Sequence, residues 1–267
     1  MIIGLLLSAG ASVQAFDARG HEVVVQLASR FFSADTEALL RNYYGSNYRL
    51  ALINDANAVA ITNQLPENTA RLALHYTWFD DDDTQFDPAK HCPQAMCSVG
   101  AVLAAERALI TPSLPRAQRM EALRALMHYM GDLHDPMNAG YRTDSSGRDI
   151  MLMGPDLRRV SLYAIWQSLL FDYLRGRPFE IANAWGRELT EQQVNEWSQG
   201  NPQAWIWETH EVARNTAYAT VGAADGWNAV YRVAVLPTFE EQIQRAAVRL
   251  AQRLNAVSAE LAAQGAL

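Results

Sequence analysis

The segment at residues 128–136, with the sequence HYMGDLHDP, constrains the fold of this chain more than any other. It lies in a stretch with helical periodicity, so His128 and Asp132, four residues apart, fall on one face of a helix. This spacing lets a helix offer two ligands to one metal ion, although it also occurs in ordinary surface pairs. Pro136 ends the helix within a turn of both residues. The segment therefore predicts a helix that carries a candidate pair of metal ligands.

Helical periodicity also dominates the rest of the chain, and no clear alternating pattern of strand type is present in the sequence. The 267 residues suit one domain, because single domains reach ~250–300 residues before they split. A hydrophobic content of 49% excludes a disordered chain. We therefore expect an all-α single domain. The segments that we expect to be helical are residues 21–32, 98–109, 116–134, 155–174, 190–197, 202–219 and 238–263.

Residues 2–15 form a short apolar stretch that ends in Val13-Gln14-Ala15, with small residues at the positions that a signal peptidase reads. We interpret residues 1–15 as a signal peptide and residues 16–267 as the domain. A buried first helix is the alternative. No other segment approaches the ~20 apolar residues of a membrane span. The expected location is therefore secreted or periplasmic.

The two cysteines, Cys92 and Cys97, lie five residues apart in the loop HCPQAMC. Export favours a local disulfide between them, since disulfides persist in oxidising compartments. A zinc site would need more ligands than these two thiols and His91. We therefore expect a disulfide at this loop.

The net charge of −7 argues against a passive nucleic-acid-binding protein, which normally presents a basic surface. It does not exclude a nuclease that contacts phosphate through metal ions. The acidic run at residues 80–83, with the sequence DDDD, is expected to be a solvated loop. A calcium site is the alternative interpretation of this run.

Seven motifs follow one another along the chain. They are FDARGH at residues 16–21, IND at 53–55, HY at 75–76, HYMGDLHDP at 128–136, SLYAIWQ at 161–167, WIWETHEVA at 205–213 and QIQRAAVRLAQRLN at 242–255. In these motifs and their order the chain resembles the zinc-dependent single-strand nucleases typified by mung bean nuclease. That family belongs to the superfamily that also contains bacterial zinc phospholipase C. The resemblance covers essentially the whole chain after residue 15, and it implies the helical phospholipase C/nuclease fold and the Cys92–Cys97 disulfide.

The resemblance implies a cluster of three zinc ions, two of them close together. The ligands implied for the close pair are the backbone nitrogen and carbonyl oxygen of Phe16 with His21 for one ion, Asp55, His75 and His128 for the other, and Asp132 as the bridge between them. Each also has a structural interpretation when taken singly. His21 would begin a helix, Asp55 would act as a cap or pair with Arg49, and His75 would be a satisfied core histidine.

The third zinc site departs from the family pattern. Where the family has two histidines and an aspartate, this chain has Asn138, Tyr163 and Gln167. Amides bind zinc weakly, and a phenol must first lose a proton whose pKa is ~10. We therefore expect two zinc ions, with the third site either empty or rebuilt from other residues. Arg148 stands where the family has a Gly-Gly-Asn turn, and its guanidinium suits phosphate; the alternative is a surface arginine, like Arg142, Arg158 and Arg159 in the same region.

Two aromatic residues near His75 bear on substrate binding. The resemblance implies that Tyr76 stacks on a base, and Trp78 stands where the family often has a polar residue that hydrogen-bonds the base. Stacking tolerates any base, so selectivity should be loose. Trp78 would equally suit an apolar pocket for a lipid substrate.

We expect an exported zinc-dependent phosphodiesterase that hydrolyses single-stranded RNA or DNA as an endonuclease, with 3'-nucleotidase activity as a further expectation. A water bridging two zinc ions becomes hydroxide near neutral pH and attacks phosphorus. Asp55 is the candidate to orient that water or act as general base, and Asp132 would hold the metal pair. The alternatives are a phospholipase C-like phosphodiesterase and a catalytically dead zinc-binding domain. No stable protein partner is evident.

Overall fold

The computed structural model describes residues 16–56, 58–59, 66–154 and 156–267, so the predicted signal peptide lies outside the described residues. Its helices and strands are α1 (Ala18–Ala28), α2 (Ala34–Tyr44), α3 (Tyr48–Asp55), η1 (Pro66–His75), α5 (Pro88–His91), η2 (Pro93–Ala95), α6 (Ser98–Leu109), α7 (Arg116–Leu133), η3 (Pro136–Asn138), η4 (Arg142–Asp144), β1 (Met151–Met153), β2 (Arg159–Ser161), α8 (Leu162–Gln167), η5 (Leu169–Tyr173), α9 (Pro178–Glu188), α10 (Glu191–Trp197), α11 (Pro202–Val212), η6 (Ala213–Tyr218), α12 (Ala219–Ala224) and α13 (Ala229–Ala263). The helical character confirms the predicted all-α fold. Within the described residues, no helix combines the length and apolar character needed to cross a membrane.

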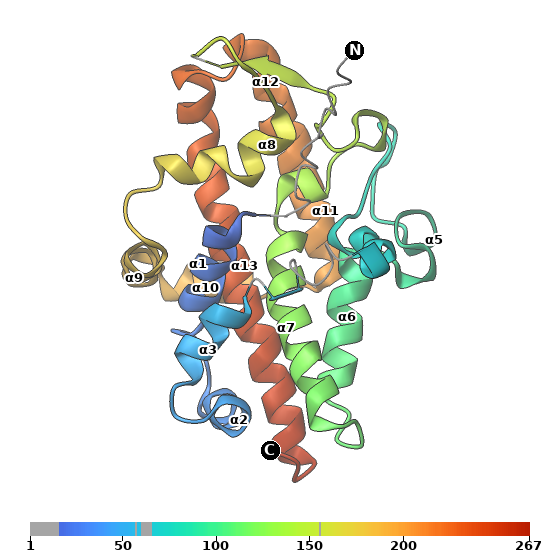
Figure 1. Cartoon of the computed structure of the whole chain (residues 1–267), viewed down its shortest axis with the longest axis vertical. Coiled ribbons are helices and arrows are strands. Elements are labelled where there is room, and N and C mark those ends of the chain that lie inside the picture. The colour runs from blue at the N-terminus through green and yellow to red at the C-terminus, as the bar shows by residue number, and fades with distance from the viewer. Residues whose placement is uncertain (1–15, 57, 60–65, 155) are drawn as a thin grey trace, which may run out of the picture.

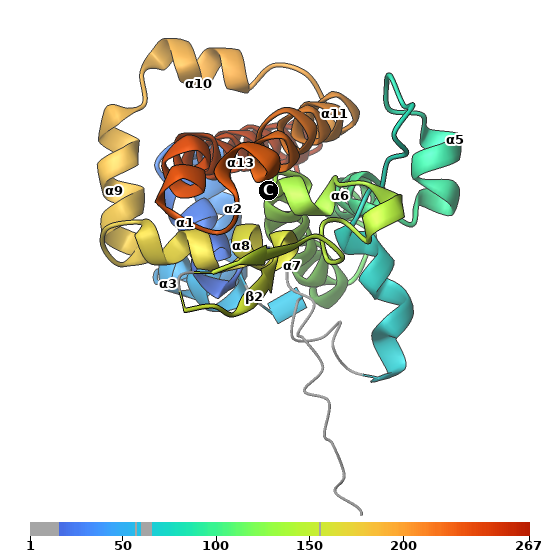
Figure 2. The same ribbon diagram turned by 90° about the horizontal axis from the view of Figure 1, so that it is seen from above.

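The long helix α13, red in Figure 1, forms the spine of the molecule. Its 35 residues bury apolar side chains at helical spacing, among them Phe239, Ile243, Ala246 and Leu250. Helix α1 packs along α13, and α6 packs along α7 beside them. Figure 2 shows α9 and α10 on the outside of the α1–α13 pair. Burial of these apolar faces is the main stabilising contribution to the fold.

The second half of α7 lies in the core. Every residue from 126 to 133 is buried, and the residues that follow it up to 140 are buried as well. His128 and Asp132 are therefore interior residues, which rules out the interpretation as a surface pair. The helix ends at Leu133, and Pro136 starts the short helix η3.

Residues 155–174 were expected to form one helix, and this expectation is wrong. Within the described residues, the segment forms β2, α8 and η5. Strand β2 pairs antiparallel with β1, with Met151 opposite Ser161. Ser161 then begins α8, because its hydroxyl accepts a hydrogen bond from the Ala164 backbone nitrogen at 3.1 Å. Ser168, with φ of −143°, breaks the helical run before η5.

The other expected helices are present, and all but one of them have altered bounds. Helix α6 has the predicted bounds, and α1 begins earlier because Asp17 caps it. The segment at 202–219 divides into α11, the π-helical η6 and the start of α12, and α13 begins at Ala229 rather than at residue 238. Helices α2, α3, α5 and α9 were not predicted.

The loop before α6 is fixed by covalent and ionic contacts. Cys92 and Cys97 form the predicted disulfide. The preceding acidic run was expected to be a solvated loop, and this expectation is wrong in part. The Asp82 side chain is 92% exposed, but that of Asp83 is only 9% exposed. Asp83 contacts Lys90 Nζ at 2.7 Å and His91 Nε2 at 2.9 Å. Its partial burial would raise the pKa, but these hydrogen bonds outweigh that effect and lower the pKa to about 2.

Candidate metal centre

Three imidazoles surround the carboxylate of Asp132. His75 Nδ1 lies 2.6 Å from Oδ2, and His128 Nε2 lies 3.3 Å from the same oxygen. His21 Nε2 lies 3.4 Å from the other oxygen, Oδ1. Each of these four side chains is at most 2% exposed. The structure thus brings together four of the residues that the sequence marked as metal ligands.

The four side chains come from three elements. His21 stands on α1, His75 is the last residue of η1, and α7 supplies His128 and Asp132. The ring of His21 stacks on that of His128, with centroids 4.2 Å apart. Gly131 permits this approach, because a Cβ at residue 131 would stand 2.8 Å from His21 Nδ1. The close packing of α1 on α7 therefore depends on a glycine next to Asp132.

The chemistry of this donor set fits a metal ion. Burial would raise the pKa of Asp132, but the charges and hydrogen bonds of His128 and His75 lower it well below its ordinary value. The side chain is therefore an anionic carboxylate in the protein interior, and its Oδ1 accepts no hydrogen bond from the described residues. Ligand atoms of His21, His128 and Asp132 all lie within 4.8 Å of one another. Imidazole nitrogen and carboxylate oxygen are ligands that zinc prefers.

Asp55 is not part of this assembly in the structure. Its Oδ2 accepts hydrogen bonds from Tyr44 Oη and from Arg124 Nε, each at 2.8 Å. The partner is thus Arg124 rather than the Arg49 that we considered. The next residue, Ala56, places its carbonyl oxygen 3.4 Å from His128 Nδ1, so the end of α3 borders the cluster.

The backbone nitrogen of Phe16 also has its hydrogen-bond partner outside this cluster. Its backbone nitrogen donates a hydrogen bond to Asp135 Oδ2 at 3.1 Å. Asp135 is fully buried and was not among the site residues identified from the sequence. Burial raises the pKa of its carboxyl to about 7, despite the backbone hydrogen bonds from Met137 and Phe16. The one signal for Asp135 in the sequence was its position, three residues after Asp132 and directly before Pro136.

The three residues that stand in place of the family's ligands for a third zinc ion lie around Asp132, Asp135 and Tyr76. Asn138 Nδ2 donates to the Asp132 carbonyl oxygen at 3.2 Å, and Gln167 Nε2 donates to Asp135 Oδ2 at 2.5 Å. The Tyr163 hydroxyl lies 3.2 Å from that of Tyr76. Both amides thus use their NH₂ groups as hydrogen-bond donors.

Arg148 covers the tyrosine pair. Its guanidinium carbon lies 3.5 Å from the centroid of the Tyr163 ring and 5.1 Å from that of Tyr76. Two of its donors are engaged, one with the Ser145 carbonyl oxygen and one with the Tyr76 hydroxyl, each at 2.8 Å. Among the described residues, no carboxylate forms an ion pair with it. Arg148 is therefore half-buried beside the cluster with donor capacity left over.

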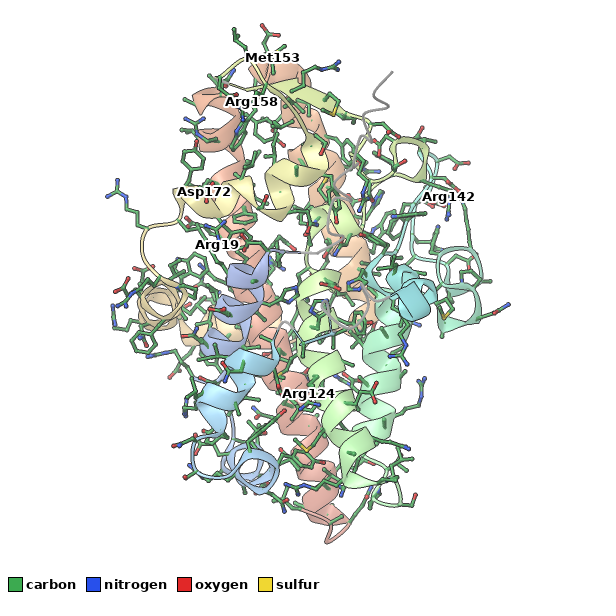
Figure 3. The ribbon with its side chains drawn as sticks, in the orientation of Figure 1. Arg19, Arg124, Arg142, Met153, Arg158 and Asp172 are labelled. Carbon is green, nitrogen blue, oxygen red and sulfur yellow. A yellow bond between two sulfur atoms is a disulfide. The ribbon has the colours of Figure 1, made fainter. Side chains whose placement is uncertain are left out.

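The two expected base-binding aromatics differ in exposure. Only 8% of Tyr76 is exposed, so its ring offers little surface to a base. Trp78 lies 5.6 Å from Tyr76 between ring centroids and is half-buried, with Arg142 over its face at 5.7 Å. Arg142 lies at the edge of the molecule, whereas Arg158 lies at the tip of the β-hairpin (Figure 3).

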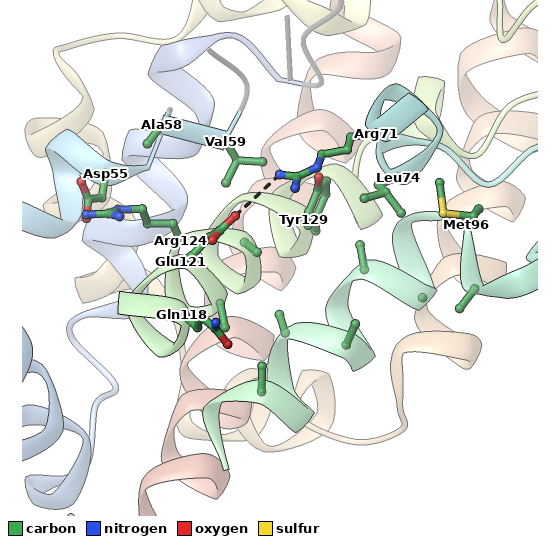
Figure 4. Close-up of a pocket in the computed structure, with 18 of the residues that line it drawn as sticks. Asp55, Ala58, Val59, Arg71, Leu74, Met96, Gln118, Glu121, Arg124 and Tyr129 are labelled. Carbon is green, nitrogen blue, oxygen red and sulfur yellow. Dashed lines mark hydrogen bonds and ion pairs between the residues drawn. The ribbon is translucent and has the colours of Figure 1, made fainter. Parts of the chain in front are cut away.

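A groove of about 940 Å³ opens beside Asp55, between α6, α7 and η1. Its apolar wall comes from Val59, Leu74, Met96 and a row of alanines (Figure 4). Its charged rim is already paired, since Arg124 contacts Asp55 and Arg71 lies 3.6 Å from Glu121.

Comparison with known proteins defines the class to which this fold and site belong. The S1/P1 nuclease family matches residues 16–259, and the chain belongs to this family. Such a protein is a nuclease, which hydrolyses phosphodiester bonds. Among its relatives, endonuclease 3 of Arabidopsis thaliana is 24% identical over 259 residues, covering 89% of this chain and 87% of the relative. Endonuclease 5 of the same plant is 22% identical over 269 residues, covering 89% and 88%. Nuclease PA3 of a Penicillium species is 22% identical over 270 residues, covering 90% and 97%.

Proposed function

We propose that this chain is an exported zinc-dependent phosphodiesterase that hydrolyses single-stranded RNA and DNA, with 3'-nucleotidase activity. The observation that carries the proposal is the buried Asp132 carboxylate surrounded by three imidazoles. Membership of the S1/P1 nuclease family supports a nucleic-acid substrate. The relatives named as endonucleases support internal cleavage.

His21, His75, His128 and Asp132 would hold two zinc ions. The geometry supports a bridging role for Asp132, because its Oδ2 faces His75 and His128 while its Oδ1 faces His21. This division matches the two ligand sets expected from the sequence. The bound ions would supply a hydroxide nucleophile and neutralise charge on the phosphate. All four side chains are at most 2% exposed, which shields this donor set from bulk solvent.

Asp55 would orient the nucleophile or accept its proton. Its carboxylate stands one residue from the Ala56 contact to His128, which supports a position at the edge of the centre. Its ion pair with Arg124 Nε, at 2.8 Å, fixes the carboxylate in this position. The substitution Asp55→Asn should therefore lower turnover more than it lowers zinc affinity.

Arg148, Tyr76 and Trp78 would bind the substrate. Two features of Arg148 favour a contact with phosphate: it is half-buried, and it has hydrogen-bond donors that no described residue uses. Its guanidinium carbon also lies 3.5 Å from the ring centroid of Tyr163, which stands at one of the positions where the family has a ligand of the third zinc ion. Trp78 is the more accessible stacking surface, and Tyr76 would act mainly by holding Arg148 through its hydroxyl. A guanidinium would thus replace part of the charge of a third zinc ion.

A second candidate function is hydrolysis of a phospholipid headgroup ester. The apolar groove of about 940 Å³ beside Asp55 favours it, since a lipid chain would fit a wall of Leu74, Met96 and alanines. The family relationship favours the nuclease.

Turnover on three substrates decides between these functions. The purified protein loaded with zinc should hydrolyse single-stranded RNA and DNA, and a chelator should abolish the activity. His128→Ala should lose it, whereas His91→Gln, which changes a histidine outside the cluster, should retain it. Activity on phosphatidylcholine with none on single strands would select the lipid function. No turnover on any of them, with zinc bound, would select the catalytically dead domain.

A further inference from the structure

The turn between η4 and Arg148 has a strained backbone. Ser145, Ser146 and Gly147 follow one another with φ angles of 56°, 60° and 76°, all in the left-handed region. Glycine adopts this region freely, whereas a residue with a side chain does so only at a cost in conformational energy. The Ser146 side chain is also fully buried, and its hydroxyl has no hydrogen-bond partner among the described residues. Such a turn persists only where its surroundings hold it, and strain of this kind is concentrated at ligand sites.

One carboxylate oxygen joins the turn to the rest of the molecule. Asp144 Oδ1 accepts the Gly147 backbone N–H at 2.7 Å and the Tyr218 hydroxyl at 3.1 Å. The Tyr218 hydroxyl oxygen in turn accepts the Tyr141 backbone N–H at 3.3 Å. Asp144 and Tyr218 therefore connect the residue that precedes η4 to the last residue of the turn.

The Tyr218 side chain reaches the turn because the helix that carries it and the segment before η4 both make room. Tyr218 is the last residue of the π-helical segment η6, and π-helical turns are frequent at functional sites. Its ring packs against that of Tyr141, with centroids 5.0 Å apart. Gly140 leaves space for the contact, since a Cβ at residue 140 would stand 2.7 Å from Tyr218 Oη and 2.9 Å from Ser146 Oγ.

The turn sets the position of Arg148, which follows it directly. Arg148 Nη1 donates to the carbonyl oxygen of Ser145, the first left-handed residue, at 2.8 Å. The Gly147 carbonyl oxygen accepts the Tyr163 backbone N–H at 3.1 Å, so the turn also fixes the start of α8. The Arg148 guanidinium lies over the Tyr163 ring. A change in the turn would therefore move the guanidinium relative to that ring.

We propose that Asp144 and Tyr218 are positioning residues, which hold the left-handed turn so that Arg148 presents its remaining donors to a phosphate group of the substrate. This inference rests on the proposed function, in which Arg148 binds phosphate. Asp144 and Tyr218 act through the turn and do not touch the substrate themselves. Their contribution is to hold one binding side chain in its productive position before the substrate arrives.

A double-mutant cycle on the zinc-loaded protein tests the proposal, with single-stranded DNA as the substrate. Tyr218→Phe removes one hydroxyl and keeps the ring. In the parental background it should lower kcat/KM ~3–10-fold, the range for one lost hydrogen bond. In the Arg148→Ala background it should change kcat/KM less than ~2-fold, because the side chain that it positions is gone. Equal losses in the two backgrounds would overturn the proposal.

Substitutions of Asp144 test the same turn through the other partner. Asp144→Ala removes the acceptor of both the Gly147 N–H and the Tyr218 hydroxyl, so it should lower kcat/KM at least ~10-fold. Asp144→Asn keeps an oxygen that can accept both bonds, and it should recover most of the rate. A loss in Asp144→Asn as large as that in Asp144→Ala would count against the proposal, since the turn needs the acceptor and not its charge.

Tyr48→Phe is the matched control. The Tyr48 hydroxyl also donates to a carboxylate, Glu37 Oε1 at 2.8 Å, but this contact joins α3 to α2. Urea unfolding should show a similar loss of stability in Tyr48→Phe and Tyr218→Phe, whereas only Tyr218→Phe should lower kcat/KM. An equal loss of turnover in Tyr48→Phe would assign the effect to stability alone and would overturn the positioning role.

A binding measurement separates failure of this proposal from failure of the proposed function. Inorganic phosphate is not hydrolysed, and its Kd for the zinc-loaded protein should rise ~3–10-fold in Tyr218→Phe when Arg148 is present and stay constant in Arg148→Ala. This pattern in a protein without turnover would reject the hydrolase function and keep the positioning role. Parental turnover on single strands, with Tyr218→Phe losses that do not depend on Arg148, would keep the function and reject the positioning role.

Discussion

Gly131 lies directly against the imidazole of His21, so that a methyl group at residue 131 would stand 2.8 Å from Nδ1. This contact couples the backbone of α7 to the His21 imidazole on α1. Gly131→Ala should therefore displace the ring and weaken zinc binding by ~10–100-fold, the range for disturbing residues that orient ligands. Competition with a chelator of known affinity measures the change.

The control for that substitution is Gly222→Ala. Gly222 is an exposed helical glycine on α12 with no atom within 4 Å of an added Cβ. It should leave zinc affinity unchanged and slightly raise stability, since alanine favours a helix. Unchanged affinity in Gly131→Ala would mean that His21 is not a ligand.

Restoring ligands at the three lost positions should restore a third ion. Asn138, Tyr163 and Gln167 now donate or share hydrogen bonds around Asp132, Asp135 and Tyr76. The triple variant Asn138→His, Tyr163→His, Gln167→Asp should raise the zinc content from about two per chain towards three. Elemental analysis gives the count. A third tightly bound ion in the unchanged protein would show that other side chains complete this site.

Arg148→Ala should lower kcat/KM on single-stranded nucleic acid by ~10–100-fold, the loss for a charge-assisted contact. The zinc content should stay the same, because Arg148 contacts Tyr76, Tyr163 and Ser145 rather than the cluster. Arg148→Lys should recover only part of the rate, since an ammonium cannot form the same fork. Arg158→Ala, at an 84% exposed side chain, is the control and should have the parental rate. Parental turnover in Arg148→Ala would rule out a role in phosphate binding.

The contacts of Asp83 should stabilise the protein in a pH-dependent way. Its pKa in the folded state is about 2, below the ordinary value of 3.8. A carboxyl with a lowered pKa contributes stability above its unfolded pKa, and the contribution is lost as the pH falls through the folded pKa. Asp83→Asn should therefore destabilise the protein near neutral pH. The difference from the parental protein should shrink between about pH 4 and about pH 2.

Urea unfolding at a series of pH values measures this difference. Asp82→Asn, at a 92% exposed position in the same run, should have little effect at any pH. A destabilisation by Asp83→Asn that did not depend on pH would show that packing, rather than charge, explains it.

Local patterns explain how much of the fold was predictable. The helical period at α7 and the proline after it fixed both the helix and the face shared by His128 and Asp132. The prediction of a single helix at residues 155–174 was wrong because short strands and short helices that contain apolar residues show no distinct periodicity in the sequence. The local sequence does indicate the start of helix α9. Pro178 stands at its first position, and the Glu180 side chain accepts a hydrogen bond from the N-cap backbone nitrogen.

The site residues that belong to recognisable motifs could be predicted from the sequence. The partners of Asp55 and Asp135 could not, because they lie far away along the chain. His21, His75, His128 and Asp132 meet as the motifs implied. The pairing of Asp55 with Arg124 joins residues 69 apart, and that of Asp135 with Phe16 joins residues 119 apart. The local sequence marks Asp135 only by its position between Asp132 and Pro136, which does not show whether the carboxylate is buried.

The central claim is that Asp132 bridges two zinc ions, and the number of zinc ions bound by matched variants tests it most directly. Elemental analysis after dialysis should give about two ions per chain for the parental protein. It should give about one for His21→Ala, which removes a ligand from one side of the carboxylate, and none for Asp132→Ala. Circular dichroism should show that each variant remains helical. A parental protein without zinc, or an Asp132→Ala protein that still holds two ions, would contradict the claim.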